Sequence, residues 1–496
     1  MLVSVARTSR PPGRPSGGSV TQTPDRPRVV VAARSFLEAA FRELASLHVL
    51  PRSRYEPWIR IGRNVGGSTV FNRQEFRDLD SALRMAFPDR FADDSIDPAQ
   101  YFAFSLLQGS VARATELGEP YDVDAPSVSQ SIEELLTILE SSMDLVCGVR
   151  LVSHIHSDRV LESLASFRIV PISKSTSAKL EISEKLDGLI PGARPLVEEA
   201  KPFLFTASKA LVVSRGEYRD FFTGVPSITE QFDAFVSALR LATGATAQNV
   251  LQISGQPYFV HPFGPYLETY PYKGSLLVER SITLNSALDA GISGLAERVA
   301  GLTAEAEGFN STVALALRRF NRSYETEAWQ DRVVDLTIGF EAALMGAKLG
   351  EEVTLRLRTR AAQLLACESD PPVHIYEDVG QIYGLRSDIV HGNPITSHTL
   401  KDRFKRIAAC REGSSLPVQI ELCVDRLRDL LRRAILTRLF LAEGLANGWP
   451  LSGRSDVEPQ LLSDRTKQEW REHWQGQLIS LGLEQAAIPA SAPTIR

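Results

Sequence analysis

The sequence has few cysteines and lacks any hydrophobic run long enough for a membrane helix. A membrane-spanning helix needs about 20 consecutive apolar residues, and apolar stretches such as 434–441 are interrupted by Arg438. The four cysteines are scattered without paired spacing: Cys147, Cys367, Cys410 and Cys423. This distribution argues against a disulfide framework and against a cysteine zinc site. We therefore expect a protein of the reducing cytoplasm that does not contact a membrane.

Motifs of nucleotide-binding and hydrolase sites are also missing. The stretch 66–69 lacks the Gly-Lys-Ser/Thr ending of a phosphate-binding loop, and no Gly-x-Ser-x-Gly elbow occurs. His154 and His156 would face the same side of a strand. A two-histidine metal site needs further ligands, however, and Asp158 is merely the nearest acid. We interpret both as ordinary core or surface histidines, and we expect no metal and no cofactor.

Length and local composition favour several domains, at about 100–200 residues each. Residues 1–28 are rich in Arg, Pro, Ser and Gly. They are expected to be a disordered tail or to follow a start codon placed too early, with an organelle transit peptide as the alternative. Residues 29–292 mix helical and β-like runs and predict an α+β domain, whose sensor role is a guess from architecture. Residues 300–446 predict an all-α bundle, and 447–496 a C-terminal helix with a frayed tail.

Periodicity indicates the individual elements. In the first ordered region it predicts helices at 35–47 and 129–143, strands at 149–155, 167–172, 203–213 and 250–253, and a loop or hairpin at 255–274. From about 288 onward the pattern is nearly continuous helix, with apolar residues at helical spacing in 327–348, 351–366, 376–391, 400–410 and 418–442. Because strand signals are absent there, we expect a helical bundle.

Arginines gather in three groups within this helical region. Residues 310–445 contain 19 Lys+Arg and 18 Asp+Glu, a net charge of +1 in a chain whose total is −5. The groups are Arg318, Arg319 and Arg322; Arg356, Arg358 and Arg360; and Arg426, Arg428, Arg432 and Arg433. A mild basic bias is compatible with binding a polyanion. We interpret the groups as solvated helix faces, with polyanion binding as the alternative.

The stretch 383–392 contains the most informative pair of side chains, Arg386 and His391. Such a pair can cut RNA without a metal ion. Histidine titrates near neutral pH and can take the proton of the 2′-hydroxyl, which only RNA has. The oxygen then attacks the adjacent phosphate, while the arginine holds that phosphate through two hydrogen bonds and stabilises its extra charge. The product would carry a 2′,3′-cyclic phosphate.

The spacing of this pair carries little information by itself. Two other Arg–His pairs, at 42 and 48 and at 150 and 156, have a similar spacing. On a regular helix, five steps of about 100° leave Arg386 and His391 about 140° apart. Either the long arginine reaches around the helix, or His391 lies where the helix unwinds at Gly392.

Three ordered segments add a family resemblance. The run 385–392, Leu-Arg-Ser-Asp-Ile-Val-His-Gly, resembles the signature helix of Apea-like HEPN domains, in which Tyr-x-x-Arg-Ser leads into an aliphatic pair and His-Gly. The stretch 335–344 resembles the family's helix with an acidic residue before Ala and Leu, and 360–365 resembles its Arg-Ala-Ala-x-Leu-Leu helix. The resemblance covers residues 300–446. It implies an antiparallel helical bundle that usually dimerises.

By this resemblance, Arg386 and His391 are the catalytic pair of a metal-independent ribonuclease. Ser387 and Asp388 are their polar neighbours, and Ser387 departs from the Asn, Asp or His that many HEPN motifs have at that position. Proteins of this kind resemble RNA-cutting effectors of toxin–antitoxin and phage-defence systems, with a phage or cellular trigger. RNA is then the substrate, and a second copy of the chain is the expected partner.

Two supporting residues and two alternative functions remain open. Glu341 and Arg360 match the other two family segments, and we interpret them as an ion pair that holds two helices together. The alternative is that Glu341 orients Arg386 or His391. Some members of the family only bind RNA, so a non-catalytic RNA-binding or scaffolding protein is the alternative function. A helical interaction protein without any role in RNA is the third interpretation.

Overall fold

The computed structural model describes most of the chain outside its first 24 residues. The described residues are 25–46, 69–88, 90–91, 121–141, 144–157, 161–162, 167–171, 209–218, 221–255, 266–269, 277–304, 309–345, 352–413, 415–442 and 457–495, with short pieces between 102 and 111. Most of them are helical. The chain divides into two compact units, residues 1–141 and 142–496. In the described part, no helix is both long and apolar enough to cross a membrane.

The first unit is helical in its described residues. It contains α1 (Arg26–Ser46), the short 3₁₀ helix η1 (Thr69–Asn72), α3 (Gln74–Ala86) and α5 (Pro126–Glu140). The Phe36 ring on α1 lies 6.2 Å from the ring of Phe71 and 6.1 Å from that of Phe76, measured between centroids. These rings fill the space between α1 and α3. The helices expected at 35–47 and 129–143 are thus present, and α1 begins earlier than expected.

The second unit begins with an antiparallel sheet. Its strands, in spatial order, are β3 (Leu161–Glu162), β4 (Phe167–Pro171), β5 (Lys209–Tyr218), β1 (Asp144–Ser153), β6 (Asn249–Gly255) and β7 (Tyr266–Thr269). Helix α8 (Phe221–Thr243) packs against β1. Gly148 permits this approach, because a Cβ there would lie 2.6 Å from Ile228 and 2.7 Å from Phe232. The division of the chain near 141 therefore separates this sheet from α1, α3 and α5, whereas we expected one α+β domain at 29–292.

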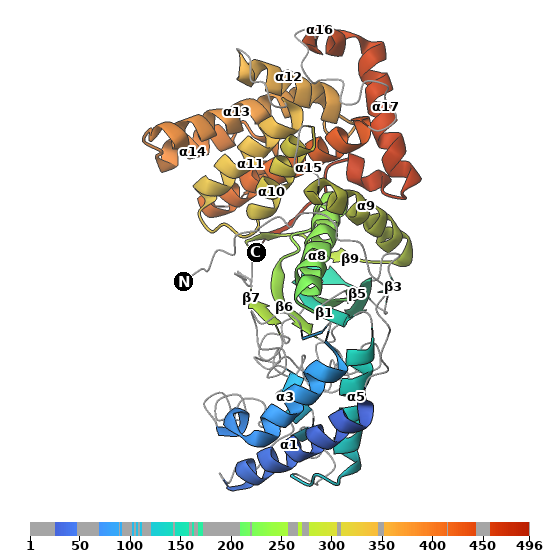
Figure 1. The fold of residues 1–496 in the computed structure, drawn as a ribbon. Helices are drawn as coiled ribbons and strands as arrows, with labels where there is room; N and C mark the ends of the chain where they lie inside the picture. The colour runs from blue at the N-terminus through green and yellow to red at the C-terminus, as the bar shows by residue number, and fades with distance from the viewer. Residues whose placement is uncertain are drawn as a thin grey trace. The chain divides into compact units, whose positions relative to one another are not determined.

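Helices make up most of the rest of the second unit (Figure 1). They are α9 (Ser286–Ala304), α10 (Phe309–Arg322), α11 (Trp329–Leu344), α12 (Val353–Leu365), α13 (Pro372–His391), α14 (Ser397–Phe404), η3 (Ala408–Glu412), α15 (Leu416–Ala442), α16 (Val457–Leu462), α17 (Asp464–Ser480) and η4 (Glu484–Ala487). The five helical stretches expected beyond 327 are all present with shifted ends. α15 lies at the centre and contacts α10, α11, α12, α13 and α17.

The hydrophobic core runs from the sheet into the helical region without a break. One cluster of buried side chains extends from Val146 on β1 to Ala487 on η4. Polar contacts cross the same junction, since Arg240 on α8 donates to Asn321 on α10 at 2.9 Å. The boundary near 292 is therefore a change of secondary structure inside one core.

The C-terminal segment is also tied to the bundle. One short antiparallel pair and one short parallel pair extend the fold: β10 (Thr494–Ile495) pairs antiparallel with β8 (Val278–Glu279), and β2 (Ile155–His156) runs parallel to β9 (Ile282–Thr283). The carbonyl oxygen of Ile488 accepts a hydrogen bond from Arg432 at 2.6 Å, and the Ala490 N–H donates to Asp429 at 3.0 Å. We expected a frayed tail after the last helix, and this expectation was wrong because the segment satisfies polar groups of α15.

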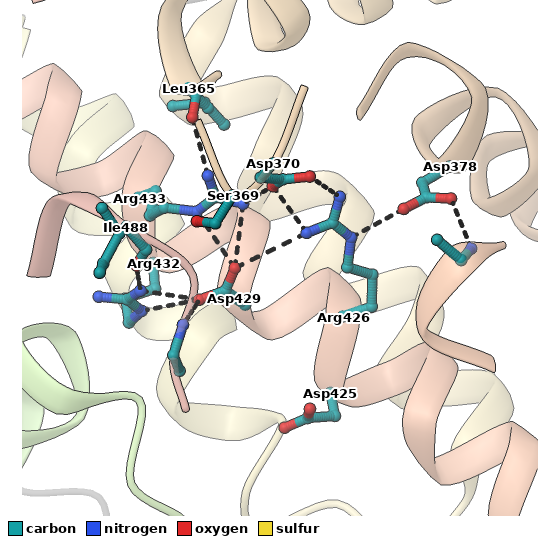
Figure 2. A network of polar contacts seen from close by, with 12 residues as sticks. Leu365, Ser369, Asp370, Asp378, Asp425, Arg426, Asp429, Arg432, Arg433 and Ile488 are labelled. Atoms are coloured by element: carbon teal, nitrogen blue, oxygen red, sulfur yellow. Dashed lines mark hydrogen bonds and ion pairs between the residues drawn. The ribbon is translucent and has the colours of Figure 1, made fainter. Parts of the chain in front are cut away.

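The arginines of α15 form a buried network with Asp429 of the same helix and with acids outside it (Figure 2). Asp429 accepts hydrogen bonds from Arg432 at 2.7 Å and from Arg433 at 3.1 Å. Arg426 donates twice to Asp370 at 2.9 Å. Burial alone would raise the pKa of Asp429, but the charges of Arg433, Arg432 and Arg426 outweigh it and lower that pKa. The interpretation of this arginine group as a solvated face was wrong, because these side chains are buried and donate to carboxylates, carbonyls and a hydroxyl inside the core.

Candidate active site

Helix α13 carries the predicted pair, and its first half is held by the buried network. Asp370 lies just before the helix, and Asp378 lies on it and accepts from Arg426 at 2.8 Å. Pro372 occupies the first turn, where its missing N–H is not needed. Gly392 ends the helix in the left-handed region with φ of 68°, a conformation that glycine adopts without strain. The network thus orients α13 from its start, while its C-terminal end reaches the surface.

His391 is the last residue of α13, and its side chain is exposed. Within the described part of the chain it makes no hydrogen bond or ion pair. Val390, which precedes it, is 50% exposed. The imidazole is therefore accessible to a ligand that approaches the end of the helix.

Arg386 lies five residues earlier on the same helix, about 140° around it from His391, and is partly buried. Its guanidinium carbon lies 5.7 Å from the centre of the Tyr383 ring. Its Nε is buried and has no hydrogen-bond partner. Among the described arginines of 309–442 that are not exposed, Arg386 alone makes no hydrogen bond to the described protein, so the protein leaves its donors unused.

Tyr383 connects Arg386 to Glu341. Its hydroxyl donates a hydrogen bond to the carboxylate of Glu341 on α11. Burial and this hydrogen bond raise the pKa of Tyr383 to about 12, so the hydroxyl remains a neutral donor at physiological pH. Tyr383 thus contacts both residues, and no hydrogen bond or ion pair joins Glu341 to Arg386 directly in the described structure. The Tyr-x-x-Arg spacing in the sequence was the signal for this role, and we had not assigned one to Tyr383.

The supporting residues divide into near and remote ones. Asp388 accepts from Arg403 on α14 at 2.7 Å and from Asn393 at 3.0 Å, so it fastens α14 to α13. Ser387 is partly exposed on the outer face of α13. Arg360 is buried elsewhere, where it donates to Glu458 and to the Leu344 carbonyl, each at 2.9 Å.

The interpretation of Glu341 and Arg360 as an ion pair was therefore wrong. Each of the two has another partner: the hydroxyl of Tyr383 for Glu341, and the carboxylate of Glu458 for Arg360. Both helices were assigned correctly, but a sequence does not show which way a side chain leaves its helix.

The other histidines and Arg–His pairs are placed differently. His154 is buried beside Glu279, with Nε2 and the carboxylate 3.2 Å apart, whereas His156 is exposed. They do not share a face, because His154 breaks the strand with φ of 61°. Arg150 is fully buried and donates to Gln252 at 2.9 Å. Asp158 and His48 lie outside the described residues.

Arg386 and His391 do not contact each other in one copy of the chain. No hydrogen bond or ion pair joins them in the described structure, in keeping with the 140° that separates them on a regular helix. Among the described residues, no group of three or more His, Cys, Asp or Glu side chains could hold a metal ion. Comparisons with protein-family models, with characterised proteins and with solved structures give no significant match.

Proposed function

We propose that this chain is a metal-independent endoribonuclease of HEPN type that uses Arg386 and His391. The observation that carries the proposal is the state of Arg386. It is partly buried, stacked near Tyr383 and without a hydrogen bond to the described protein. A guanidinium whose donors are not used by the protein is suited to a phosphate, which accepts two parallel hydrogen bonds. The exposed His391 follows on the same helix.

The proposed reaction contains two proton transfers, one from the 2′-hydroxyl to an imidazole and one from an imidazolium to the leaving 5′-oxygen. His391 takes the proton of a 2′-hydroxyl, and the 2′-oxygen forms a bond to the adjacent phosphorus. The bond from phosphorus to the 5′-oxygen breaks, and that oxygen receives a proton from an imidazolium. Arg386 stabilises the charge that develops on the phosphate oxygens. The products are a 2′,3′-cyclic phosphate and a 5′-hydroxyl.

A dimer belongs to the same proposal. Because one helix directs the two side chains to different sides, Arg386 of one copy and His391 of the other can form one composite site. The exposed Val390 supplies apolar surface next to His391 for such a contact. In this proposal the protein is a cytoplasmic effector of toxin or phage-defence type, and the part of the chain before the helical region senses its trigger.

Two substitutions test the assignment. His391→Ala and Arg386→Ala should each lower RNA cleavage by the purified chain about 10²–10⁴-fold, as removal of a general base or of a charge-stabilising group does. Thermal unfolding should stay near that of the wild type, since neither side chain bonds to the described protein.

His374→Ala and His398→Ala are the matched controls, because both histidines are exposed on the same part of the bundle. They should cleave as the wild type does. A wild-type chain that binds RNA without cutting it would identify a non-catalytic RNA-binding protein. Full cleavage by both folded active-site variants would end the assignment of the pair.

A further inference from the structure

A second arginine, Arg358 of α12, lies against α13 at Gly380, three helical turns before His391. The guanidinium of Arg358, which comes from α12, lies directly over Gly380. A Cβ at Gly380 would meet its Cζ at 2.7 Å, so only glycine allows this approach. Gly380 and His391 are 11 residues apart, which places them within about 20° of each other around the helix and about 16 Å apart along it. Arg358 and His391 therefore occupy one line on the surface of α13.

The guanidinium of Arg358 is held in place without an acidic partner. Its Cζ lies 3.8 Å from the centre of the Tyr376 ring, and its Nε donates to the Tyr376 carbonyl at 2.9 Å. No carboxylate pairs with it in the described structure, and the side chain is partly exposed. The neighbouring Arg403 differs, because Asp388 neutralises it. Arg358 thus keeps two nitrogens for a ligand and loses little freedom on binding one.

The surface between Arg358 and His391 carries no bulky side chain of α13. Gly384 and Ser387 lie on the same line, and the end of the Arg403 side chain lies over Gly384, where a Cβ would meet its Nη1 at 2.4 Å. Its Nη1 donates to the Gln381 carbonyl at 2.8 Å. A strand lying along this face would pass from the unpaired guanidinium of Arg358 to the exposed imidazole of His391.

We propose that this face of α13 binds single-stranded RNA, with Arg358 holding a backbone phosphate a few nucleotides from the scissile bond. This inference rests on the proposed function and adds a substrate subsite to it. A phosphate contact by a planar, preorganised arginine strengthens binding whatever the base sequence. Longer RNA should therefore be cut faster than a dinucleotide, because only longer RNA reaches Arg358.

Binding is measured with the full chain carrying His391→Ala, so that RNA is not consumed. A labelled oligonucleotide of about eight nucleotides matches the span of single-strand binding grooves. Adding Arg358→Ala should weaken its binding about 10-fold, the effect of losing one hydrogen bond to a charged group. The slope of log affinity against log salt should fall by about 0.7, the value for one phosphate contact on a single strand. Arg358→Lys should keep that slope and recover part of the affinity.

Gly380→Ala separates the position of the guanidinium from its charge. The new methyl group displaces the flexible end of Arg358 without removing it, so binding should weaken as in Arg358→Ala. Gly476→Ala is the matched control, because a Cβ at that exposed helical position meets nothing within 4 Å. Arg465→Ala controls for loss of a surface charge, since Arg465 is 87% exposed on α17.

In the chain with an intact His391, Arg358→Ala should slow cleavage of the long oligonucleotide and leave cleavage of a dinucleotide unchanged. A purely structural brace would affect both substrates equally. Unaltered affinity and salt slope in the folded Arg358→Ala variant would overturn this subsite and leave the ribonuclease proposal intact. A chain that neither binds nor cuts RNA would overturn both.

Discussion

Two groups of arginines in the helical region differ in what their guanidinium groups contact. Arg426, Arg432 and Arg433 are buried and use their donors on carboxylates and carbonyls of the core. Arg386 and Arg358 each lie beside a tyrosine ring and have no acidic partner in the described structure. The first group holds the fold together, whereas the second has donors left for a phosphate. The sequence does not separate the two groups, because the packing of the helices decides which carboxylates and carbonyls reach each guanidinium.

A prediction at this scale concerns Tyr383 as a positioning residue. Tyr383→Phe removes the hydroxyl that occupies the carboxylate of Glu341, and the freed carboxylate then competes with phosphate for Arg386. We expect kcat for RNA cleavage to fall about 10-fold, the equivalent of about 1.4 kcal/mol, with a small change in KM. Steady-state kinetics on an oligonucleotide measures both.

Glu341→Gln provides the rescue. It keeps an acceptor for Tyr383 but removes the charge, so alone it should change kcat little. Combined with Tyr383→Phe it should restore most of the lost rate. A double variant as slow as Tyr383→Phe alone would show that the hydroxyl acts in some other way.

Helices were predicted well where one face is apolar and the other polar, as for α11, α12 and α13. Helix α8 was missed, because its first turns contain Gly224, Pro226 and several β-branched residues, which have low helix propensity. The Arg–His pair was proposed from spacing and motif order, and its role stays a prediction. The contacts of Glu341 and Arg360 were not, because rotamers and the third partners, Tyr383 and Glu458, decide them.

The network behind α13 gives a prediction at the scale of elements. Asp429→Asn removes the charge that several buried arginines share and should destabilise the fold by about 3–5 kcal/mol at neutral pH. The pKa of Asp429 is lowered in the folded chain. The stabilisation by its charge is therefore complete at pH values above the pKa of an unfolded aspartate, near 4, and is lost as the pH falls through the folded pKa. Urea unfolding of the wild type and the variant at several pH values measures the difference.

The difference between the two chains should therefore shrink progressively below about pH 4. Asp464→Asn is the control, since that side chain is 92% exposed at the start of α17. It should leave the unfolding midpoint close to that of the wild type. Equal stability of Asp429→Asn and wild type at pH 7 would contradict a supporting role for the network.

At the scale of the whole molecule, the proposed site is complete only when two chains meet. One chain presents an exposed His391 and a partly buried Arg386 on different sides of α13. A two-fold contact is the commonest symmetry of protein assemblies. It can place Arg386 of one chain next to His391 of the other. Residues 142–496 share one continuous core from the sheet to η4. We therefore expect this whole unit, and not the helical region alone, to form the dimer with a second copy.

Mixing two inactive chains tests this arrangement. Arg386→Ala and His391→Ala should each be inactive alone. Heterodimers contain one composite site with both wild-type residues, so subunit exchange should restore part of the activity. Mixtures shown to exchange subunits but still inactive, or full activity in a proven monomer, would refute the shared site without touching the assignment of the pair.

The most direct test of the ribonuclease account is the chemistry of the product ends in the presence of a chelator. The wild-type chain is incubated with an end-labelled RNA and excess EDTA, and the fragments are analysed by mass spectrometry. We predict undiminished cleavage, 2′,3′-cyclic phosphate and 5′-hydroxyl ends, and no such fragments with His391→Ala. Cleavage that stops with the chelator, or fragments that end in 3′-hydroxyl groups, would contradict a metal-independent reaction through Arg386 and His391.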